Sequence, residues 1–439
     1  MTDSHKNRTG KAWASMTRRR GYVSLVAAAA ALSLVSACSS SGGNSASGAT
    51  TGNSAVSGSP IKVGVLMSLS GSAASGFTGV EDGVKARLAV ANAAGGVDGH
   101  KITYVMGDDT SSPQGNLAAV NRLIQQEHVT AIIEVSSFFF GGYKAAVTAG
   151  VPVFGTGFDG GPEWLDKSNK NLFDVNGVGD YTKVPTTFGK IAKALGITKM
   201  GGLSYSSSPS AQLSVHEWVE SAKQAGVAAG YQKAVPFGST DTGPVVLGVK
   251  NSATDGFYMS TIPNTAFSVA SGLSQQGAKL KGVFLATGYG GDLLSDKAAT
   301  QAAQGLYFLT SSAPVELKTE GTMKMQDGLH KYASQSADVV PSFSQTEGWL
   351  ATDALVWGLG NAGKDLSAKN IVSSSRDATW DAAGLTKPVD FSSYGEIAGG
   401  GVGPGNCLYV VQLEGSGFKP VPQLSPVCGD LIPGLTVEP

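Results

Sequence analysis

The sequence predicts an α/β protein with two lobes, each built around a doubly wound parallel sheet. Three observations support this prediction. Short runs of β-branched and aliphatic residues alternate with segments whose apolar residues recur at helical spacing. The alternation begins near residue 60 and is repeated in a second series after residue 180. Finally, 41% of the 439 residues are hydrophobic, which is enough to fill a large core.

The first series opens with a strand at 61–67, followed by a helix at 79–92 that repeats apolar residues at helical spacing. The segment Gly95-Gly96-Val97-Asp98-Gly99 ends this helix, because glycine adopts the positive φ of a helix exit. Ser112-Pro113 starts the next helix with an N-cap residue and an N1 proline. The other elements predicted in this series are a strand at 102–106, a helix at 112–126, a strand at 129–135, a helix at 143–149 and a strand at 151–154.

The second series predicts the second lobe, and a late helix and strand follow it. The helix at 345–361 is marked by Trp349, Asp353, Val356 and Trp357. No short-period repeat, P-loop or GxGxxG motif occurs in the sequence. Helices are predicted at 183–195, 211–224, 244–251, 265–276, 292–303 and 345–361, and strands at 199–205, 256–259, 283–286, 306–310 and 408–413.

The N-terminal region predicts export. Three arginines at 18–20 precede an uncharged stretch at 21–37, which is too short and too rich in alanine for a membrane span. The end of this stretch, Leu34-Val35-Ser36-Ala37-Cys38, resembles the lipobox of bacterial lipoproteins, which implies that Cys38 carries a lipid. The alternative is an ordinary signal peptide cut near Ala37. A loose twin-arginine pattern at 19–23 leaves the export route open.

Charge and cysteine content limit the classes of partner and the cellular compartment that the sequence supports. The 32 basic and 33 acidic residues give a net charge of −1, so nothing favours a nucleic-acid or polybasic membrane surface. Residues 39–59 are almost all small or polar and predict a flexible tether. With Cys38 lipidated, Cys407 and Cys428 remain as one pair and predict a disulfide in an oxidising compartment. Two unpaired thiols are the alternative.

Four loops of the first lobe are predicted to share one rim. Ligands of open parallel sheets lie beyond the carboxyl ends of the strands, which selects the loops 68–78, 108–112, 136–142 and 155–161. These loops contain hydroxyl side chains and glycines beside aromatic residues. Backbone N–H groups exposed at glycines, together with a helix N-terminus, favour a carboxylate or similar anion. The rim is suited to binding rather than to bond cleavage.

A series of short segments occurs in a characteristic order: Ile61-Lys62-Val63-Gly64-Val65-Leu66, Ser68-Leu69-Ser70-Gly71, Asn92 with Gly95-Gly96-Val97-Asp98-Gly99, Asp108-Asp109, Ser112-Pro113-Gln114 and Gly150-Val151-Pro152-Val153. With these segments the sequence resembles the type I periplasmic binding proteins of branched-chain amino acid ABC importers over about residues 60–415. This resemblance implies two lobes that are joined by three crossovers and close over a solute by a hinge motion. We accordingly expect a signal peptide at 1–37, a tether at 38–59, one lobe at 60–177 with 311–395, and the other at 178–310 with 396–439.

The resemblance also implies site residues. Ser136-Ser137 match the family's serine-rich segment for the ligand carboxylate, and 157–159 match its second contact loop. The family places an acidic residue for the ligand ammonium after the strand at 283–286, whereas this chain has Tyr289 nearest that position. Either Asp159 takes this role from the other lobe or the ligand has no ammonium. The expected ligand-contacting residues are Phe77, Ser136, Ser137, Phe138, Gly157, Phe158, Asp159, Tyr205 and Tyr289.

Structural alternatives exist for several of these residues. Ser136 and Ser137 could only cap the following helix. Phe139 is expected in the core, because adjacent side chains cannot all face one cleft, whereas the aromatic run at 138–140 and Tyr289 together favour a larger, partly aromatic or apolar solute. Asp108 and Asp109 are expected to satisfy turn amides.

Catalysis is not predicted. The five histidines are dispersed, and the sequence contains neither HExxH spacing nor a GxSxG elbow in a strand, turn and helix. We therefore expect no enzyme activity, cofactor or metal.

The expected function is that of a monomeric, lipid-anchored receptor on the outer face of the cell membrane. It would deliver a small solute to an ABC permease with cytoplasmic ATPases, through closure that the bound ligand stabilises. A ligand sensor for a membrane kinase or receptor is one alternative, and an exported hydrolase is another.

Overall fold

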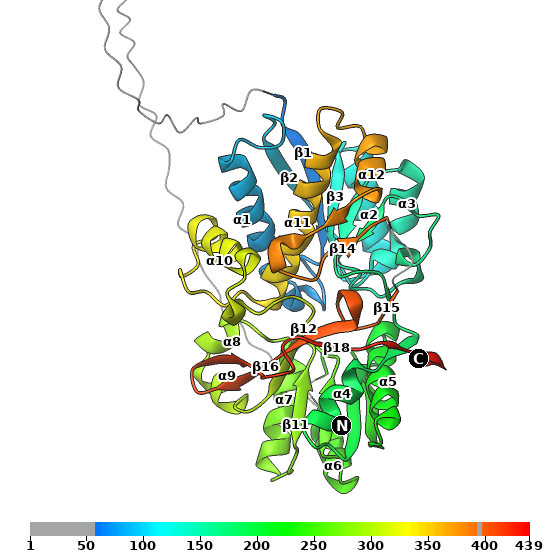
Figure 1. Ribbon diagram of the computed structural model, residues 1–439, viewed down its shortest axis with the longest axis vertical. Helices are drawn as coiled ribbons and strands as arrows, with labels where there is room; N and C mark the ends of the chain where they lie inside the picture. Colours follow the sequence, from blue (N-terminus) through cyan, green and yellow to red (C-terminus); the bar gives the residue numbers. More distant parts are fainter. Residues whose placement is uncertain (1–57, 240, 393–396) are drawn as a thin grey trace, which may run out of the picture. The chain divides into compact units, whose positions relative to one another are not determined.

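The computed structural model describes residues 58–239, 241–392 and 397–439, which form two sheets with helices on both faces of each (Figure 1). The first sheet is parallel throughout and has the order β2-β1-β3-β4-β5. Val65 in its central strand lies opposite Met106 and Ile133. The strands are β1 (Ile61–Met67), β2 (Ile102–Asp108), β3 (Ala131–Val135), β4 (Val153–Gly155) and β5 (Leu172–Asp174).

Both faces of this sheet are buried, which is why its strands are nearly continuous apolar runs. Val65 packs into the core beneath α1 (Val80–Ala93) and α11 (Phe343–Ala362). Its neighbour Leu66 points the other way, into the core beneath α2 (Pro113–Gln125) and α3 (Tyr143–Ala149). Two further helices, α10 (Glu320–Tyr332) and α12 (Ala368–Arg376), pack against α1 and α11 respectively.

Helices α1 and α11 approach each other so closely that glycine is required at the contact. A Cβ atom on Gly83 would lie 2.1 Å from the carbonyl oxygen of Gln345, and one on Gly348 would lie 2.2 Å from that of Val80. A buried ion pair crosses the same interface, with Nε of Arg87 2.5 Å from Oδ1 of Asp353. The position of α11 is therefore fixed by backbone contact as well as by charge.

The second sheet has the order β17-β16-β12-β11-β10-β8-β9, with β18 paired to β16. The pairings from β9 to β12 are parallel, and β16, β17 and β18 join antiparallel. Helices α4 (Thr187–Ala194) and α5 (Pro209–Gln224) cover one face, and α6 (Gly243–Asn251) and α7 (Pro263–Gln275) cover the other. The strands are β8 (Lys199–Tyr205), β9 (Ala228–Val235), β10 (Gly256–Met259), β11 (Gly282–Leu285), β12 (Tyr307–Thr310), β16 (Cys407–Glu414), β17 (Gly417–Pro420) and β18 (Val427–Cys428).

The chain crosses from one sheet to the other three times, after β5, after β12 and before β16. Short strands join the crossing segments: β6 (Gly179–Asp180) pairs with β15 (Ala398–Gly399), and β7 (Lys183–Pro185) pairs with β19 (Leu431–Thr436). The predicted fold class of two doubly wound parallel-sheet units is confirmed. The exact lobe boundaries stay a prediction.

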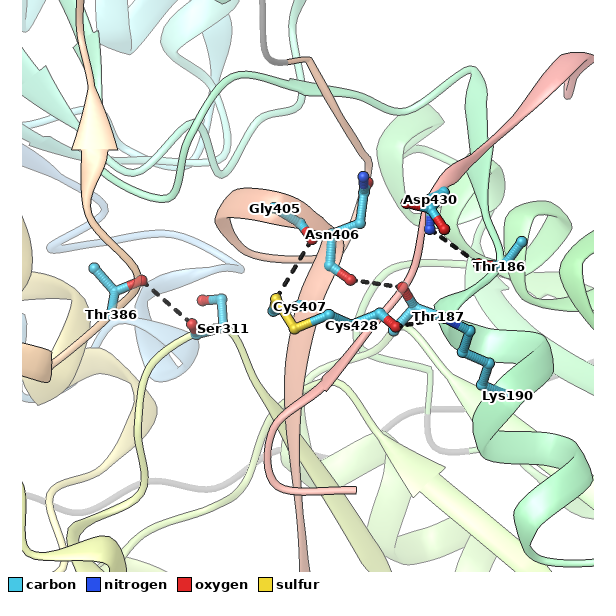
Figure 2. The surroundings of a disulfide bond; sticks show 10 residues. All are labelled: Thr186, Thr187, Lys190, Ser311, Thr386, Gly405, Asn406, Cys407, Cys428 and Asp430. Atoms are coloured by element: carbon cyan, nitrogen blue, oxygen red, sulfur yellow. Dashed lines mark hydrogen bonds between the residues drawn. A yellow bond between two sulfur atoms is a disulfide. The ribbon is translucent and has the colours of Figure 1, made fainter. Parts of the chain in front are cut away.

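A disulfide between Cys407 and Cys428 joins β16 to β18 beside the start of α4 (Figure 2). Two side chains of this region donate hydrogen bonds to the disulfide-bearing segments. Thr187 Oγ1 donates to the carbonyl oxygen of Asn406 over 2.6 Å, and Lys190 Nζ donates to that of Cys428 over 2.8 Å (Figure 2). The cross-link therefore fastens the C-terminal strands to the second sheet.

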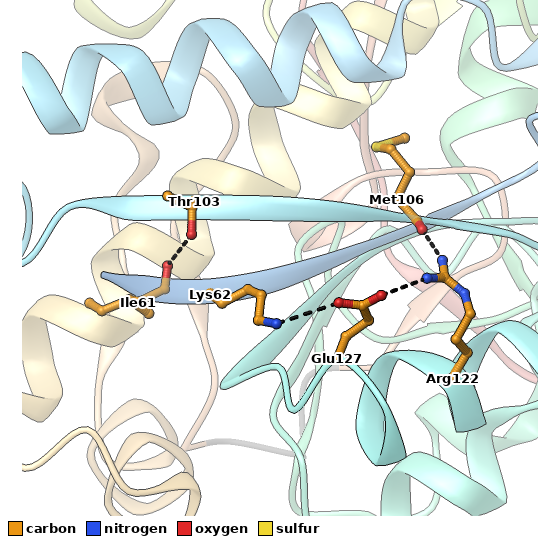
Figure 3. A network of polar contacts seen from close by, with 6 residues as sticks. All are labelled: Ile61, Lys62, Thr103, Met106, Arg122 and Glu127. Atoms are coloured by element: carbon orange, nitrogen blue, oxygen red, sulfur yellow. Dashed lines mark hydrogen bonds and ion pairs between the residues drawn. The ribbon is translucent and has the colours of Figure 1, made fainter. Parts of the chain in front are cut away.

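A half-exposed polar network ties β1, β2 and α2 together (Figure 3). Glu127 pairs with Lys62 over 3.4 Å and with Arg122 over 3.0 Å, and Arg122 also donates to the carbonyl oxygen of Met106. Exposed pairs of this kind contribute at most about 1 kcal/mol each. The network orients surface side chains rather than determining the fold.

Most predicted elements are confirmed, but two predicted helices are wrong in their extent. The segment 183–195 begins with β7 before α4, because Pro185 lacks an N–H and β7 pairs with β19. The segment 292–303 is divided into α8 (Gly291–Ser295) and α9 (Lys297–Ala302). Asp296 is extended between them, and its side chain accepts from the backbone N–H groups of Ala298 and Ala299 as the cap of α9.

The predicted signal peptide, Cys38 and nearly all of the predicted tether lie outside the described residues. Within the described ranges, no helix combines the length and apolar character needed to cross a membrane.

Candidate functional site

The four predicted loops meet at the carboxyl edge of the first sheet, as expected. Buried Asp109 is their hub, because its carboxylate accepts hydrogen bonds from Ser68 Oγ at 2.6 Å, Ser111 N at 2.7 Å and Ser136 Oγ at 2.5 Å. Oδ2 of Asp159 accepts from the backbone N–H of Phe140 over 2.7 Å and so ties the third loop to the fourth. The shared rim is confirmed.

Asp108 has the structural role that the sequence suggested. Burial by itself would raise the pKa of this carboxyl, but hydrogen bonds from Ser70 Oγ and from the amides of Thr110, Ser70 and Leu69 hold its pKa below the usual value. Asp108 is therefore ionised and hydrogen-bonded within its own turn, where it stabilises the loop rather than binding a ligand.

A cavity of about 1040 Å³ opens between this rim and the carboxyl ends of the second sheet's parallel strands. Both sheets, the crossing segments and the N-terminal end of α11 contribute to its wall. Eight of the nine residues predicted to contact a ligand line it: Phe77, Ser137, Phe138, Gly157, Phe158, Asp159, Tyr205 and Tyr289.

Ser136 is the exception. Its side chain is completely buried behind the wall, where its hydroxyl donates to Asp109 and accepts from Asn116 Nδ2 at 3.1 Å and Phe138 N at 3.0 Å. The expectation that both serines reach a ligand is therefore corrected, because the hydroxyl of Ser136 is engaged within the loop hub. The helix-capping alternative is also wrong, since α3 begins at Tyr143 with Gly142 as its cap.

Aromatic rings form much of the cavity wall. The ring of Phe158 lies 5.7 Å from that of Phe77 and 5.4 Å from that of Phe343 at the start of α11. On the second sheet, the Tyr205 ring lies 4.5 Å from that of Phe237. These centroid distances are typical of favourable aromatic pairs. Phe139 is fully buried, as predicted for a core residue.

The two predicted tyrosines present their rings rather than free hydroxyls. Tyr289 Oη donates to Glu316 Oε2 over 2.7 Å and accepts from the backbone N–H of Val315 over 3.0 Å. Tyr205 Oη donates to Thr265 Oγ1 over 2.9 Å and accepts from Ile262 N over 3.2 Å. Each hydroxyl is already satisfied within the fold, so neither hydroxyl is free to bind a ligand.

Asp159 lines the cavity, but its oxygens are held by its own loop. They accept from the amides of Phe140 and Gly161 and from Trp164 Nε1, the last over 2.8 Å. Burial raises the pKa of Asp159 and of its neighbour Glu163, and the two acidic groups interact with each other. This arrangement favours a loop-holding role and leaves Asp159 a poor candidate for the missing ammonium partner.

Several polar residues of the wall were missed by sequence reasoning. Thr156 and Thr261 are 3% and 5% exposed, and their hydroxyls have no partner among the described residues. Asn176 donates from Nδ2 to the carbonyl oxygen of Thr156 over 3.0 Å and to Glu347 Oε2 over 3.2 Å. No motif marks these positions, because three crossings of the chain bring them together.

Glu347 is the acidic member of this group. It lies on α11, is 2% exposed, and lines the cavity. Burial raises its pKa to about 7, although the hydrogen bond from Asn176 opposes the shift. Asp174 at the end of β5 is also buried in the wall, and burial raises its pKa well above the usual value.

The charge of the wall has one sign. Its acidic residues are Asp82, Asp159, Asp174, Asp292, Asp338 and Glu347, and no Lys, Arg or His occurs among the described residues that line it. No group of three or more His, Cys, Asp or Glu within the described ranges is arranged to hold a metal ion.

Comparison with known proteins agrees with the fold. The family model for periplasmic binding proteins matches residues 60–418. The chain belongs to this family. A Leu/Ile/Val-binding protein homolog from Brucella abortus (strain 2308) is 41% identical over 64 residues, a match that spans 15% of this chain and 17% of the length of that relative.

Solved structures of other periplasmic binding proteins share the fold at low sequence identity. An R. palustris solute-binding protein in complex with benzoate has a TM-score of 0.67 at 18% identity, covering 84% of this chain and 98% of that one. A branched-chain amino acid ABC transporter protein from Thermus thermophilus with bound valine has a TM-score of 0.68 at 14% sequence identity, and the match covers 84% of this chain and 97% of that one. A fatty acid ABC transporter substrate-binding protein from Thermomonospora curvata has a TM-score of 0.65 at 17% sequence identity, and the match covers 88% of this chain and 95% of that one. These relatives confirm the type I architecture predicted from the sequence.

Proposed function

We propose that this periplasmic binding protein captures a small solute in the cavity between its two sheets and delivers it to an ABC importer. The observation that carries the proposal is the cavity itself, because its wall combines Phe158 and Ser137 of one sheet with Tyr205 and Tyr289 of the other. A solute that touches both sides stabilises the closed arrangement, since only that arrangement provides all contacts.

The solute is amino acid-like, or a larger and partly aromatic or apolar carboxylate or amide. Two features support this range. The wall has several aromatic rings, and a volume of about 1040 Å³ exceeds what a single small side chain fills. The structural relatives include proteins with bound valine and bound benzoate. Phe77 and Phe158 would contact the apolar part, and Ser137 would bind the polar end.

We propose further that Cys38 carries the lipid that holds the mature protein at the outer face of the membrane. The sequence of the lipobox-like segment and the small, polar residues after it support this assignment. A tether of about twenty residues has an r.m.s. reach of roughly 25 Å, which leaves the folded part free to meet a permease.

Native mass spectrometry of the gently purified protein tests solute capture. The expected result is one retained small molecule per chain, recovered chemically unchanged after incubation. Phe158→Ala is expected to lose it, whereas Leu117→Ala, an exposed apolar residue of α2 that does not line the cavity, keeps it. Conversion of the recovered compound would contradict the proposal and favour a hydrolase.

Uptake of the identified solute tests delivery. Cells of the source organism that lack the gene are expected to lose uptake of the labelled compound and to regain it with the wild-type gene. Normal uptake in the deletion strain would contradict the transport role, and a lost signalling response in the same cells would instead favour a sensor.

A further inference from the structure

Glu347 is a buried carboxyl of α11 that lines a small void together with residues of the second sheet. The loop after β11 reads Thr287-Gly288-Tyr289-Gly290 and offers no carboxylate. A small void next to the main cavity is nevertheless lined by Thr287 and Tyr289 of this loop together with Glu347 of α11. A carboxyl group therefore reaches this corner from the other sheet's helix, from a position more than fifty residues later in the sequence.

Two buried hydroxyls of the cavity wall have unused hydrogen-bonding capacity. Thr156 and Thr261 line the cavity from opposite sheets, and both hydroxyls are buried without a partner among the described residues. An unmade hydrogen bond of a buried hydroxyl costs about 1–3 kcal/mol. A solute with donor groups that enters this corner satisfies these hydroxyls, which is a second indication of a binding subsite besides the carboxyl group.

The electrostatics of the corner require a positive partner. Asp174 interacts electrostatically with Glu347, and Tyr289 lines the same small void as Glu347. Glu134 and Asp159 lie beyond Asp174, and Glu316 lies beyond Tyr289. Asp82 of α1 and Asp292 of α8 line the same cavity. None of these groups is basic. Two buried carboxyls without a cation are stable only when protonated or when a cation arrives with the ligand.

We propose that Glu347, supported by Asn176 and by the hydroxyls of Thr156 and Thr261, binds a protonated amino group of the solute. This inference rests on the proposed function and narrows it, because a solute with an amino group, either an amine or a zwitterion, is selected over a simple carboxylate. Asn176 positions the carboxylate by donating to Oε2, and Ser311 Oγ in turn donates to Asn176 Oδ1 over 3.2 Å.

Solute affinity is expected to depend on pH, because binding is linked to the ionisation of Glu347. Burial raises the pKa of Glu347 to about 7, so roughly a tenth of the groups are ionised at pH 6 and nine-tenths at pH 8. An amino group near pKa 10 stays protonated over this range. If only the ionised carboxyl binds it, affinity rises by about tenfold from pH 6 to pH 8, and binding at pH 7 releases about half a proton.

The test uses two sets of three probes, and each set consists of an amine, a zwitterion and a carboxylate. The aromatic set is 2-phenylethylamine, L-phenylalanine and 3-phenylpropanoate. The aliphatic set is isoamylamine, L-leucine and 4-methylpentanoate. Titration calorimetry of the full mature protein at pH 6 and pH 8 gives affinity and proton release. At least one amine or zwitterion is expected to bind about tenfold more tightly at pH 8. Glu347→Gln is expected to lower that affinity by tenfold to a hundredfold at pH 8 and to abolish the pH dependence.

Glu320→Gln is the matched control, because Glu320 is an exposed acidic residue of α10 that does not line the cavity. It removes the same charge and is expected to change affinity by no more than about twofold. Melting curves of both variants establish that they fold.

Three results would overturn the inference: binding by the carboxylate probes alone, an unchanged affinity in Glu347→Gln, or no binding by any amine or zwitterion. The copurification experiment above does not depend on solute charge. A retained solute without an amino group would therefore refute the role of Glu347 while leaving solute capture intact.

Discussion

Replacing Gly348 by alanine tests whether the α1–α11 contact holds the cavity wall in place. A Cβ at this position would lie 2.2 Å from the carbonyl oxygen of Val80, whereas ordinary van der Waals contact begins at 3.4 Å. The two helices would have to separate by about 1.2 Å. Because the obstructing atom belongs to backbone inside a helix, no side chain can rotate away to relieve the overlap.

The cost follows from packing. Overfilling a close-packed interface typically destabilises by about 1–3 kcal/mol, and a backbone clash belongs at the upper end of that range. Alanine also gains about 0.5–1 kcal/mol of helix propensity over glycine. The expected net effect of Gly348→Ala is therefore a loss of roughly 2 kcal/mol in the free energy of unfolding.

Gly360→Ala is the control in the same helix. Gly360 is exposed, and a Cβ there would meet nothing within 4 Å. This substitution should raise the free energy of unfolding by about 0.5–1 kcal/mol. Urea titrations followed by tryptophan fluorescence measure both values. Solute affinity should fall in Gly348→Ala, because the neighbouring residue Glu347 moves with the helix, and should be unchanged in Gly360→Ala.

The reasoning is refuted if Gly348→Ala is as stable as the wild type, or if both variants gain stability equally. Either result would mean that the helices are not in backbone contact. If the Gly348→Ala variant is destabilised but binds solute with wild-type affinity, the helix contact contributes to stability and does not position the binding site.

Three further predictions concern the loop hub, the buried acids and the cross-link. Ser136→Ala should destabilise the protein by about 1–3 kcal/mol, because it leaves buried hydrogen-bonding groups unpaired. Ser137→Ala should leave the melting temperature unchanged and weaken solute binding. Equal melting temperatures of the two variants would disprove this distinction between the two serines. Burial raises the pKa of Glu163 to about 9, so the folded state holds a proton that the unfolded state loses near pH 4.5. Stability should accordingly fall as pH rises between these values, with a shallower fall in Glu163→Gln, and an equal slope in denaturation curves would contradict this. Reduction of the Cys407–Cys428 disulfide, which closes a separation of 21 residues, should cost about 3 kcal/mol in urea denaturation, and an unchanged midpoint would argue against a constraint on the unfolded chain.

The sequence predicted those parts of the fold that depend on local pattern. The strands 199–205 and 256–259 and the helix 143–149 agree with β8, β10 and α3 at both ends, because their apolar periodicity and flanking turns act within a few residues. Strand β9 was not predicted. It is largely unburied and contains Gly230 and three alanines, so it has little of the β-branched pattern of the central strands.

The site was predictable where a topological rule applies. Loops that follow parallel strands must meet at one edge, which placed Ser137 and Phe158 in the wall. The rule cannot tell which side of a loop each residue faces, and Ser136 turned inward to Asp109. Glu347 was beyond reach, because its place depends on how a late helix packs against the first one.

A crystal structure of the mature protein with its copurified solute tests the central claim most directly. The account predicts one unaltered molecule in the cavity between the two sheets, in contact with Ser137 and Phe158 on one side and with Tyr205 on the other. A solute bound elsewhere on the surface, or a chemically changed product in the cavity, would contradict it.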